Sequence, residues 1–581
     1  MGKIMVAEKS IGATIRERSL AMNNALLAKL EVLVGRKHLL ISDHRTRAYR
    51  TGFRYGGGNV LAVVRPGSLI EQWYVLCACA EANKIVIVQA ANTGLTGGST
   101  PDGNNYDRDI VIINTLRMNK IQPLKGGEEA ICFPGATLEQ LERDLAKLGR
   151  DPHSVIGSSC IGASVIGGVS NNSGGALIQR GPAYTELALF ARLGTDGGLT
   201  LVNHLGIELG SDPVEILQRL DSGTYCDQDL APKGKRVASA TDYANLVRDI
   251  DADTPARFNG DESKLFEASG CAGRVIVFAV RLDTFPKPGR TQTYYLGTNS
   301  PQHFTDLRRE MLARFFALPV SAEYLHREAY DMAVKYGKDI FLMIYHLGTS
   351  SIPVLFQLKS RFEAILEKLG LKRLAFTDRF LQFASGLFPN QIPKRVRAFR
   401  NKFEHHLILT MSDQGIDEAE RYLSAAFKGE WFKCTQDEGR RASLNRFAAA
   451  SAAIRYRALS DSKVNGMIAL DIALPRNERN WFESLPSNIE QGVSHKLYYG
   501  HFFCHVFHQD YIVRKGHDAE QIESEMLNLL DQRGVRYPAE HNVGHHYKAS
   551  APMVEFYKKL DPSNSFNPGI GRTTKCTHWR C

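Results

Sequence analysis

Apolar residues recur along the start of the chain in two alternating patterns, which predict short strands separated by helices. NVLAVVRPGS (59–68) is an apolar run closed by Pro-Gly, LIEQWYVLCACAEAN (69–83) has apolar positions at helical spacing, and KIVIVQA (84–90) is again a continuous apolar run. Short apolar runs predict buried strands, and helical periodicity between them predicts a crossover helix. We therefore predict a βαβ unit, preceded by a helix over residues 12–34 whose leucines recur at near-helical spacing.

The same alternation continues to about residue 285. DIVIINT (109–115) predicts a strand, EAICFPGATLEQLERDLAKLG (129–149) a strand and a helix, and GRVIVFAVRLDTF (273–285) a strand with period-two alternation. The following PKPG predicts a domain boundary. Charged helical stretches such as DLRREMLARFFAL (306–318) come next, and residues from about 416 to 530 return to a mixed α/β pattern.

Two tracts of small residues lie next to the predicted strands. QAANTGLTGGST (89–100) follows the second strand of the βαβ unit, and GSSCIGASVIGGVSNNSGG (157–175) contains almost nothing bulky. Glycines allow positive φ and a close approach of a ligand to backbone amides, and ligands of such sheets bind at the carboxyl ends of strands. Because neither GxGxxG nor GxxxxGK[ST] is present, we expect a phosphate-bearing ligand held in some other way.

Histidines gather near the end of the chain. The histidines of YYGHFFCHVFHQDY (498–511) and AEHNVGHHYK (539–548) fall within residues 501–546, which hold seven of the 18 histidines. A single buried histidine is more often a core or interface residue than a functional one. Imidazoles clustered beside a glutamate favour a proton-handling site or a metal site.

Charge and hydropathy narrow the class of protein. Between Lys359 and Lys402, eleven Lys and Arg face three acidic residues, so most of the net charge of +10 is local. No nucleic-acid-binding motif accompanies this charge, and we expect no nucleic-acid partner. No apolar run approaches the roughly 20 residues of a membrane span, and MGKIMVAEKS lacks a secretory core, so we expect a cytosolic protein.

Four motifs carry a family resemblance. VVRPGS, QAANTGLTGGS, IGASVIGGVSNNSGG and GCAGRVIV occur in this order, as in the FAD-binding domain of the vanillyl-alcohol oxidase and p-cresol methylhydroxylase superfamily, which the chain resembles. The resemblance implies an α+β fold with a two-subdomain FAD-binding domain. It implies FAD contacts at Ala91, Asn92, Thr93, Gly94, Leu95, Gly98, Ser99, Gly157, Ser164, Gly174 and Ile276. The first loop lacks the histidine that attaches the flavin in some members, so non-covalent FAD is expected.

The end of the chain resembles the FAD-linked D-2-hydroxy-acid dehydrogenases. Glu540 and His541 match their Glu-His pair, and YKKLDPSNSFNPGIG (557–571) matches their closing motif. The resemblance implies His541 as catalytic base with Glu540 beside it. His501 and His508 match paired histidines that bind a metal with the glutamate in some members. Because HFFCHVFH and EHNVG depart from the usual motifs, the presence of a divalent metal is left open.

Over nearly its full length the chain is similar to the respiratory, quinone-dependent D-lactate dehydrogenases of bacteria. The resemblance implies oxidation of D-lactate to pyruvate by hydride transfer to flavin N5, with electrons passed to ubiquinone or menaquinone. An unidentified Arg or Lys would bind the substrate carboxylate. The alternatives are another D-2-hydroxy acid such as 2-hydroxyglutarate with a soluble acceptor, an oxygen-using alcohol oxidase, or a non-catalytic binding module.

Domain boundaries follow from the patterns and the resemblance together. We expect an FAD-binding domain over 1–285 that is completed by 531–581, and a cap, or substrate, domain of mixed α/β type over 286–350 and 405–530. The segment 351–404 interleaves basic residues and phenylalanines, as expected of a helical surface that binds anionic membrane lipids. We therefore expect a peripheral protein on the cytoplasmic face of the bacterial inner membrane.

Overall fold

The computed structural model describes residues 20–153, 161–231, 234–348 and 376–580. Residues 20–34 are helical, which confirms the described part of the predicted first helix; residues 12–19 lie outside the described residues. The described chain contains sheets of four, five and seven strands, with helices packed against them. None of its helices is long and apolar enough to cross a membrane.

The four-stranded sheet has the order β1-β2-β4-β3, and both β2 and β3 pair in parallel with β4. Its elements are β1 (Leu39–Leu40), α2 (Asp43–Arg50), β2 (Ala62–Val64), α3 (Leu69–Glu81), β3 (Ile85–Gln89) and β4 (Ile110–Asn114). The predicted βαβ unit is confirmed as β2-α3-β3, with β4 inserted between its two strands. All residues of β2 and β4 are buried, which explains why their sequences are continuous apolar runs.

The five-stranded sheet is antiparallel and has the order β5-β6-β10-β8-β9. Its strands are β5 (Ile121–Leu124), β6 (Glu129–Cys132), β8 (Ala188–Leu193), β9 (Leu199–Asn203) and β10 (Ile276–Asp283), and β7 (Arg150–Asp151) pairs with β11 (Phe285–Pro286). Helices α4 (Leu138–Ala146), α5 (Val165–Ser170), α6 (Pro213–Ser222) and α7 (Tyr243–Arg248) belong to the same stretch of chain. The predicted strand over 273–285 is confirmed as β10, which lies at the centre of the sheet.

The seven-stranded sheet is antiparallel and has the order β15-β12-β14-β13-β17-β18-β16. Its strands are β12 (Thr291–Thr298), β13 (Ser321–His326), β14 (His405–Ser412), β15 (Glu430–Lys433), β16 (Val464–Ala473), β17 (Val493–His501) and β18 (Val506–Arg514). The helices of this region are α8 (Pro301–Arg314), α9 (Arg327–Tyr336), α10 (Lys338–Leu347), α12 (Phe376–Gly386), α13 (Lys394–Lys402), α14 (Gln414–Ala425), α15 (Gln436–Leu459), α16 (Ser487–Glu490) and α17 (Ala519–Gln532). A last helix, α18 (Ala551–Leu560), precedes the carboxyl end.

Neighbouring residues of the seven-stranded sheet point to opposite faces, as strand geometry requires. Tyr294 and Tyr498 belong to the core that includes residues of α8, α14 and α17. Their neighbours Tyr295 and Tyr499 belong to the core shared with α9 and α15. The sheet is therefore buried on both faces, and polar side chains on the α15 face are exceptional.

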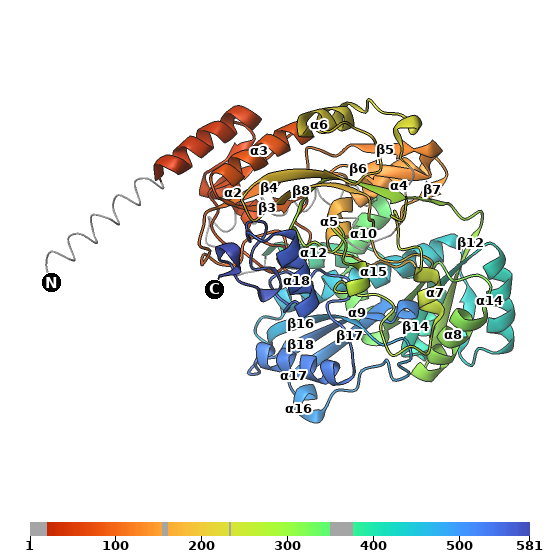
Figure 1. Ribbon diagram of the computed structural model, residues 1–581. Helices are drawn as coiled ribbons and strands as arrows, with labels where there is room; N and C mark the ends of the chain where they lie inside the picture. Colours follow the sequence, from red (N-terminus) through yellow and green to blue (C-terminus); the bar gives the residue numbers. More distant parts are fainter. Residues whose placement is uncertain (1–19, 154–160, 232–233, 349–375, 581) are drawn as a thin grey trace.

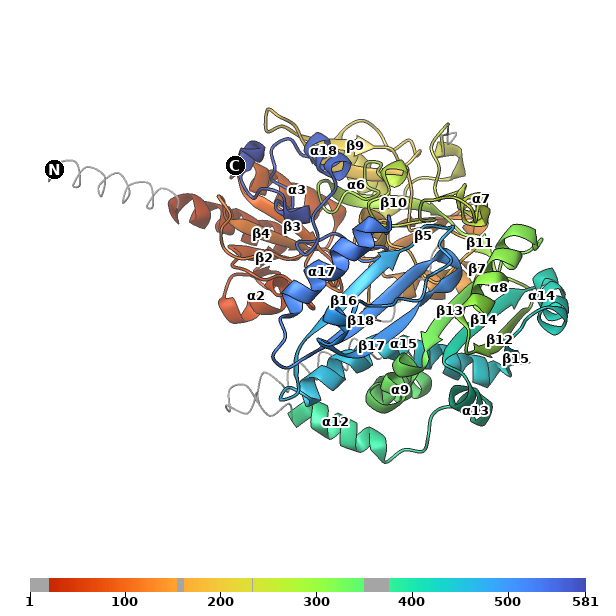
Figure 2. The same ribbon diagram turned by 90° about the horizontal axis from the view of Figure 1, so that it is seen from below.

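The three sheets form two layers (Figure 1). The four- and five-stranded sheets lie above the seven-stranded sheet in the view of Figure 1, with α15 between them. Figure 2, seen from below, shows the strands of the seven-stranded sheet toward the viewer. The carboxyl-terminal segment returns to the four-stranded sheet, where Val86 N donates to Ser565 O and Asn567 N donates to Val86 O, each at 2.9 Å. Residues from both ends of the chain thus lie beside the first glycine tract.

Candidate active site

The first glycine tract follows the end of β3, and several of its backbone N–H groups are free to bind a ligand. Within the described part of the chain, none of the backbone N–H groups of residues 91–95 donates a hydrogen bond to a protein acceptor. The loop is held instead by side chains: Asn92 Nδ2 donates to Thr51 O at 2.8 Å, and Ser99 Oγ donates to Asn92 Oδ1 at 3.0 Å. A run of unpaired amides is a donor set suited to a pyrophosphate. These residues fit the FAD that the sequence predicts.

The second glycine tract lies against the first. A Cβ placed on Gly162 would meet the Cβ of Ala91 at 3.7 Å. Ser164 caps α5 by accepting a hydrogen bond from Gly167 N at 3.0 Å. Both tracts therefore border one site, as a shared ligand requires. Gly157 lies outside the described residues.

Two further predicted contacts lie at opposite ends of this region. Ile276 begins β10 and pairs with Ala191 of β8, while β6 pairs with β10 only from Val280 onward. The other backbone edge of Ile276 is thus not covered by β6. At Gly174, an added Cβ would lie 2.5 Å from Glu540 Oε1, so the second glycine tract touches the histidine-rich region directly.

The seven-stranded sheet brings polar side chains together on its α15 face. The register pairs Glu323 of β13 with His501 of β17, and Asp471 of β16 with His508 of β18. Directly opposed residues of neighbouring strands have side chains on the same face. Two imidazoles and two carboxylates therefore form a continuous polar patch, to which a loop after α17 adds Glu540 and His541.

His501 lies between two carboxylates. Its Nδ1 is 2.6 Å from Glu323 Oε1, and its Nε2 is 3.1 Å from Glu540 Oε2. Burial alone would lower the pKa of His501, but Glu323 and Glu540 outweigh it and raise this pKa to about 10. Burial would likewise raise the pKa of Glu540, yet His501 and Arg257 hold it well below its usual value.

Asp471 organises the other two histidines. Its Oδ2 accepts hydrogen bonds from the backbone N–H groups of Glu540 at 2.7 Å and His541 at 2.8 Å, and lies 3.3 Å from His541 Nδ1. His508 Nδ1 is 3.4 Å from Asp471 Oδ1, and His508 Nε2 is 3.8 Å from Glu540 Oε2. Burial lowers the pKa of His541 although Asp471 opposes the shift, so this imidazole is neutral near pH 7.

Sequence reasoning did not identify four members of this site. Asp471 and Glu323 lie on separate strands, and Arg257 and Arg446 are supplied by a loop and by α15. Arg257 Nη2 donates to Glu540 Oε1 at 2.8 Å although the two residues are 283 positions apart, and Arg446 Nε is 2.9 Å from Glu323 Oε2. No local motif marks these residues, because only strand register and domain packing bring them together.

Three of the four remaining histidines of the cluster have partners that fix them in the structure. His505 Nδ1 faces Pro475 O at 3.0 Å, and His545 Nε2 faces Thr100 O at 2.9 Å. His546 Nε2 faces Glu523 Oε1 at 3.0 Å. Of the seven histidines, the structure therefore unites His501, His508 and His541.

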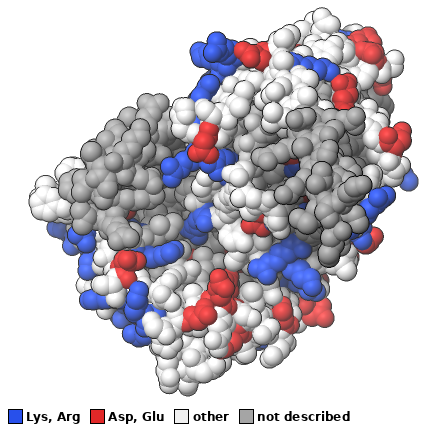
Figure 3. Space-filling model, turned by 90° about the vertical axis from the view of Figure 1, so that its left-hand side faces the viewer, with Lys and Arg blue, Asp and Glu red and all other residues white. Residues whose placement is uncertain are grey.

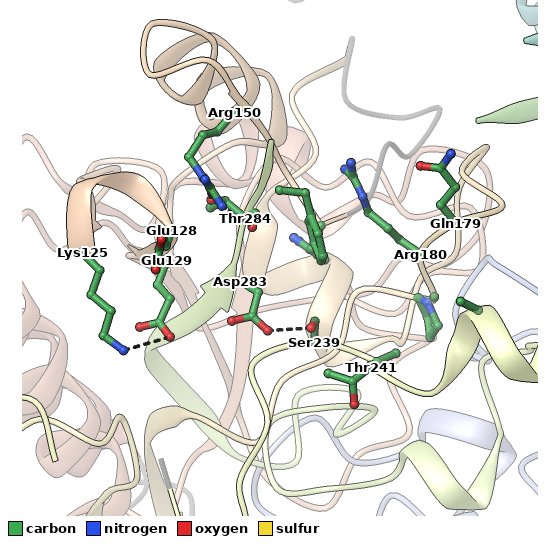
Figure 4. Close-up of a pocket in the computed structure, with 16 residues that line it drawn as sticks. Lys125, Glu128, Glu129, Arg150, Gln179, Arg180, Ser239, Thr241, Asp283 and Thr284 are labelled. Carbon is green, nitrogen blue, oxygen red and sulfur yellow. Dashed lines mark hydrogen bonds and ion pairs between the residues drawn. The ribbon is translucent and has the colours of Figure 1, made fainter. Parts of the chain in front are cut away.

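A cavity of about 510 Å³ lies apart from this site, beside β6, β7 and β10 (Figure 4). Its charged groups face partners: Lys125 Nζ is 3.6 Å from Glu129 Oε1, and Ser239 Oγ donates to Asp283 Oδ2 at 2.6 Å. None of the predicted site residues lines it. The cavity is therefore distinct from the candidate active site.

Comparisons with known proteins agree with this geometry. A family profile described as FAD binding domain matches residues 60–195, and one described as D-lactate dehydrogenase, membrane binding, matches residues 293–579. The quinone-dependent D-lactate dehydrogenase of Escherichia coli (strain K12) is 56% identical over 96% of this chain and 98% of its own length. The chain belongs to the quinone-dependent D-lactate dehydrogenase family.

Another member of this family, from Corynebacterium glutamicum, is 46% identical over 94% of this chain and 96% of its own length. The mitochondrial D-2-hydroxyglutarate dehydrogenase of Bos taurus matches 21% of this chain at 31% identity. Among solved structures, p-cresol methylhydroxylase with substrate bound has a TM-score of 0.56 at 12% identity and covers 95% of this chain and 97% of its own. The predicted α+β, p-cresol methylhydroxylase-type fold is confirmed, and so is FAD as the cofactor.

Proposed function

We propose that this protein oxidises D-lactate to pyruvate with bound FAD and passes the electrons to a membrane quinone. The observation that carries the proposal is the contact between Gly174 and Glu540, which joins the FAD-binding glycine tract to the histidine-carboxylate site. Full-length similarity to quinone-dependent D-lactate dehydrogenases supports the substrate and the acceptor. Bound FAD supplies the acceptor for the hydrogen on C2 of the substrate.

His541 is the proposed base for the substrate hydroxyl. Its side chain is 35% exposed, compared with 10% for His501. With a proton on Nδ1 facing Asp471, Nε2 carries the lone pair that accepts the hydroxyl proton. Glu540 cannot serve as the base in the same way, because Arg257 and His501 already bind its two oxygens.

His501, His508 and Glu540 form the proposed divalent-cation site. Their ligand atoms lie within 4.8 Å of one another. In both histidines Nδ1 faces a carboxylate and Nε2 faces Glu540, which is the arrangement that orients metal-binding imidazoles. A cation there would polarise the substrate hydroxyl and favour its deprotonation.

A proton and a cation compete for the same atoms of this site. With His501 protonated, the carboxylates of Glu323, Asp471 and Glu540 face the positive charges of His501, Arg257 and Arg446, and the site is neutral. A dication in place of that proton adds one positive charge to this group of six side chains. Metal analysis of the purified protein, followed by chelation and re-addition of Zn²⁺ or Mn²⁺, tests the site: loss and recovery of flavin reduction supports it, and full activity in metal-free protein contradicts it.

The test of the proposed function is an anaerobic titration of the purified protein. The absorption spectrum should show flavin bands that bleach on addition of D-lactate and persist with L-lactate. D-2-hydroxyglutarate is the third substrate, because the bovine relative carries that name. If D-2-hydroxyglutarate bleaches the flavin in preference to D-lactate, D-2-hydroxyglutarate is the substrate. If peroxide forms in air at the rate of lactate oxidation, oxygen and not a quinone is the electron acceptor.

We further propose that the protein docks on anionic lipids at the cytoplasmic face of the inner membrane and binds no nucleic acid. Phe380 (59% exposed), Phe383 (69%) and Leu387 (74%) follow one another at helical spacing along α12 and just beyond it. Apolar anchors of this kind insert at the headgroup boundary of a bilayer. Phe362 and the rest of residues 351–375, which belong to the predicted lipid-binding segment, lie outside the described residues.

Within the described part of the segment, α13 offers less unpaired charge than the sequence predicts. Three basic residues of α13 are paired with acidic residues: Arg395 with Glu438, Arg400 with Asp331, and Lys402 with Glu430. On the face shown in Figure 3, Lys and Arg also lie interspersed with Asp and Glu. We therefore assign the larger part of docking to the exposed apolar side chains of α12.

Vesicle binding tests this assignment. The variant Phe380→Ser/Phe383→Ser should lose at least about tenfold in affinity for vesicles containing phosphatidylglycerol, from the loss of two buried aromatic side chains. Its flavin reduction by D-lactate should not change. Phe316→Ser is the matched control, since Phe316 is 84% exposed but lies after α8. Equal loss in both variants, or no loss in the double variant, contradicts the assignment.

A further inference from the structure

The carboxylate of a 2-hydroxy acid needs a cation beside the proposed base. Within the described residues, Arg257, Arg446 and Arg54 each come close to the histidine-carboxylate site. The first two are committed to protein carboxylates. Arg257 binds Glu540 Oε1 at 2.8 Å and is 3% exposed, and Arg446 binds Glu323 Oε2 at 2.9 Å with its guanidinium 4.9 Å from the ring centre of Tyr499.

Arg54 comes from the other layer of the molecule. It lies in the loop between α2 and β2, which rests on the first glycine tract. A Cβ on Gly97 would lie 2.9 Å from Tyr55 O, and Asn92 Nδ2 donates to Thr51 O at 2.8 Å. The loop that carries Arg54 is thus fixed to the amides assigned to FAD.

The same glycine tract also fixes the loop that carries His541. Thr96 Oγ1 donates to Asn542 O at 2.8 Å, and a Cβ on Gly98 would collide with the Asn542 side chain. Tyr55 also packs against His546, with ring centres 5.4 Å apart. Tyr55, which follows Arg54 in the chain, lies against Gly97, and Asn542, which follows His541, lies against Gly98. Gly97 and Gly98 therefore bring the loops of Arg54 and His541 together.

Within the described residues, no hydrogen-bond or ion-pair partner binds the guanidinium of Arg54. Its Nε is buried without a hydrogen bond, and no carboxylate of the described residues lies within 4.0 Å of the group. Its charge nevertheless reaches the site. Arg54 is among the charged groups that interact electrostatically with Asp510 and with His541.

We propose that Arg54 binds the carboxylate of the substrate and thereby holds its C2 hydroxyl beside His541. A guanidinium offers two parallel N–H donors to a carboxylate, and an unpaired buried donor gains most from such a partner. This inference rests on the proposed function and deepens it. Substrate binding then bridges the FAD-binding loop and the sheet that carries the histidines.

The test measures the Kd of D-lactate from the saturation of the anaerobic flavin-reduction rate. Arg54→Met should raise this Kd about 10²-fold, the loss expected for a paired charged hydrogen bond, while the limiting rate changes less than about tenfold. Arg54→Lys, which keeps the positive charge but lacks the two parallel N–H donors of a guanidinium, should raise the Kd of D-lactate about tenfold. D-lactamide, which lacks the negative charge, should bind Arg54→Met and the parent protein alike.

Arg45→Met is the matched control, because Arg45 is an exposed arginine of the neighbouring helix α2. An unchanged Kd for D-lactate in Arg54→Met, or equal weakening of D-lactate and D-lactamide, overturns the inference. If Arg54→Met fails to retain FAD, the Kd of D-lactate is measured in Arg54→Lys instead. A Kd in Arg54→Lys equal to that of the parent protein would contradict the proposal. Absence of bleaching by D-lactate in the parent protein is a different outcome, since it refutes the proposed function itself.

Discussion

Two groups of histidines lie on or against the same seven-stranded sheet in opposite environments. The aromatic histidines are His326, His405 and His406, and the carboxylate histidines are His501, His508 and His541. Tyr324 OH lies 2.7 Å from His405 Nδ1, and the rings of Phe482 and Trp481 lie 4.8 and 6.1 Å from that imidazole. Burial lowers the pKa of His405 and of His406 to about 3, whereas the carboxylates around His501 raise its pKa to about 10.

The difference shows that neighbours, and not the histidines themselves, decide the chemistry. The members of both groups are on antiparallel strands, except His541, which lies in the loop after α17. An imidazole among aromatic rings stays neutral and packs as a core side chain, while an imidazole held by a carboxylate can hold a proton, transfer it or bind a cation. The following changes test this contrast, from the largest expected effect to the smallest.

Asp471→Asn should slow flavin reduction by D-lactate about 10²-fold, because Asp471 orients both the His541 ring and the backbone that carries it. The measurement is the single-turnover rate per bound FAD. Asp339→Asn is the matched control. Like Asp471, Asp339 is a buried carboxylate, but it is paired with Arg455 and lies outside the site. A rate within about threefold of the parent for Asp471→Asn would show that this carboxylate has no part in catalysis.

Gly174→Ala should slow the same step about tenfold. The new Cβ would lie 2.5 Å from Glu540 Oε1 and 2.9 Å from Arg257 Nε, so the buried ion pair must shift. Gly386→Ala, at a glycine with no atom within 4 Å of an added Cβ, should be neutral. Unchanged kinetics in Gly174→Ala would mean that the glycine tract and the histidine site are not coupled.

His406→Phe should keep flavin reduction and change only the pH dependence of stability. The folded pKa of His406 is about 3, below the 6.5 of an unperturbed histidine, so the unfolded chain binds the proton first as pH falls. Stability is therefore lost below pH 6.5, at about 1.4 kcal/mol per pH unit for this group. Urea unfolding near pH 7.5 and near pH 5.5 should show a smaller loss in His406→Phe by about 1 kcal/mol. An identical loss in both proteins would mean that His406 does not contribute to acid sensitivity.

Much of the fold could be predicted because its signals are local. The apolar runs of β2, β3, β4 and β10 and the order of the glycine motifs depend on short stretches of sequence. The order β1-β2-β4-β3 could not be predicted, since nothing in DIVIINT indicates that its strand lies between the two strands of the preceding unit.

The candidate site divides in the same way. Glu540 and His541 are marked by a short motif, and His501 and His508 flank a tight connection between adjacent strands. Asp471, Glu323 and Arg257 join them only through strand register and through contacts across hundreds of residues. Sequence reasoning therefore identified the histidines and Glu540, and missed Asp471, Glu323 and Arg257, whose charges act on them.

The most direct test of the account is the single-turnover rate of flavin reduction by D-lactate in His541→Gln, measured beside His406→Phe. We expect a rate about 10² to 10⁴ lower in His541→Gln, with FAD content unchanged, and a rate equal to the parent in His406→Phe. A parental rate in His541→Gln, or equal losses in the two variants, would contradict the assignment of His541 as the base.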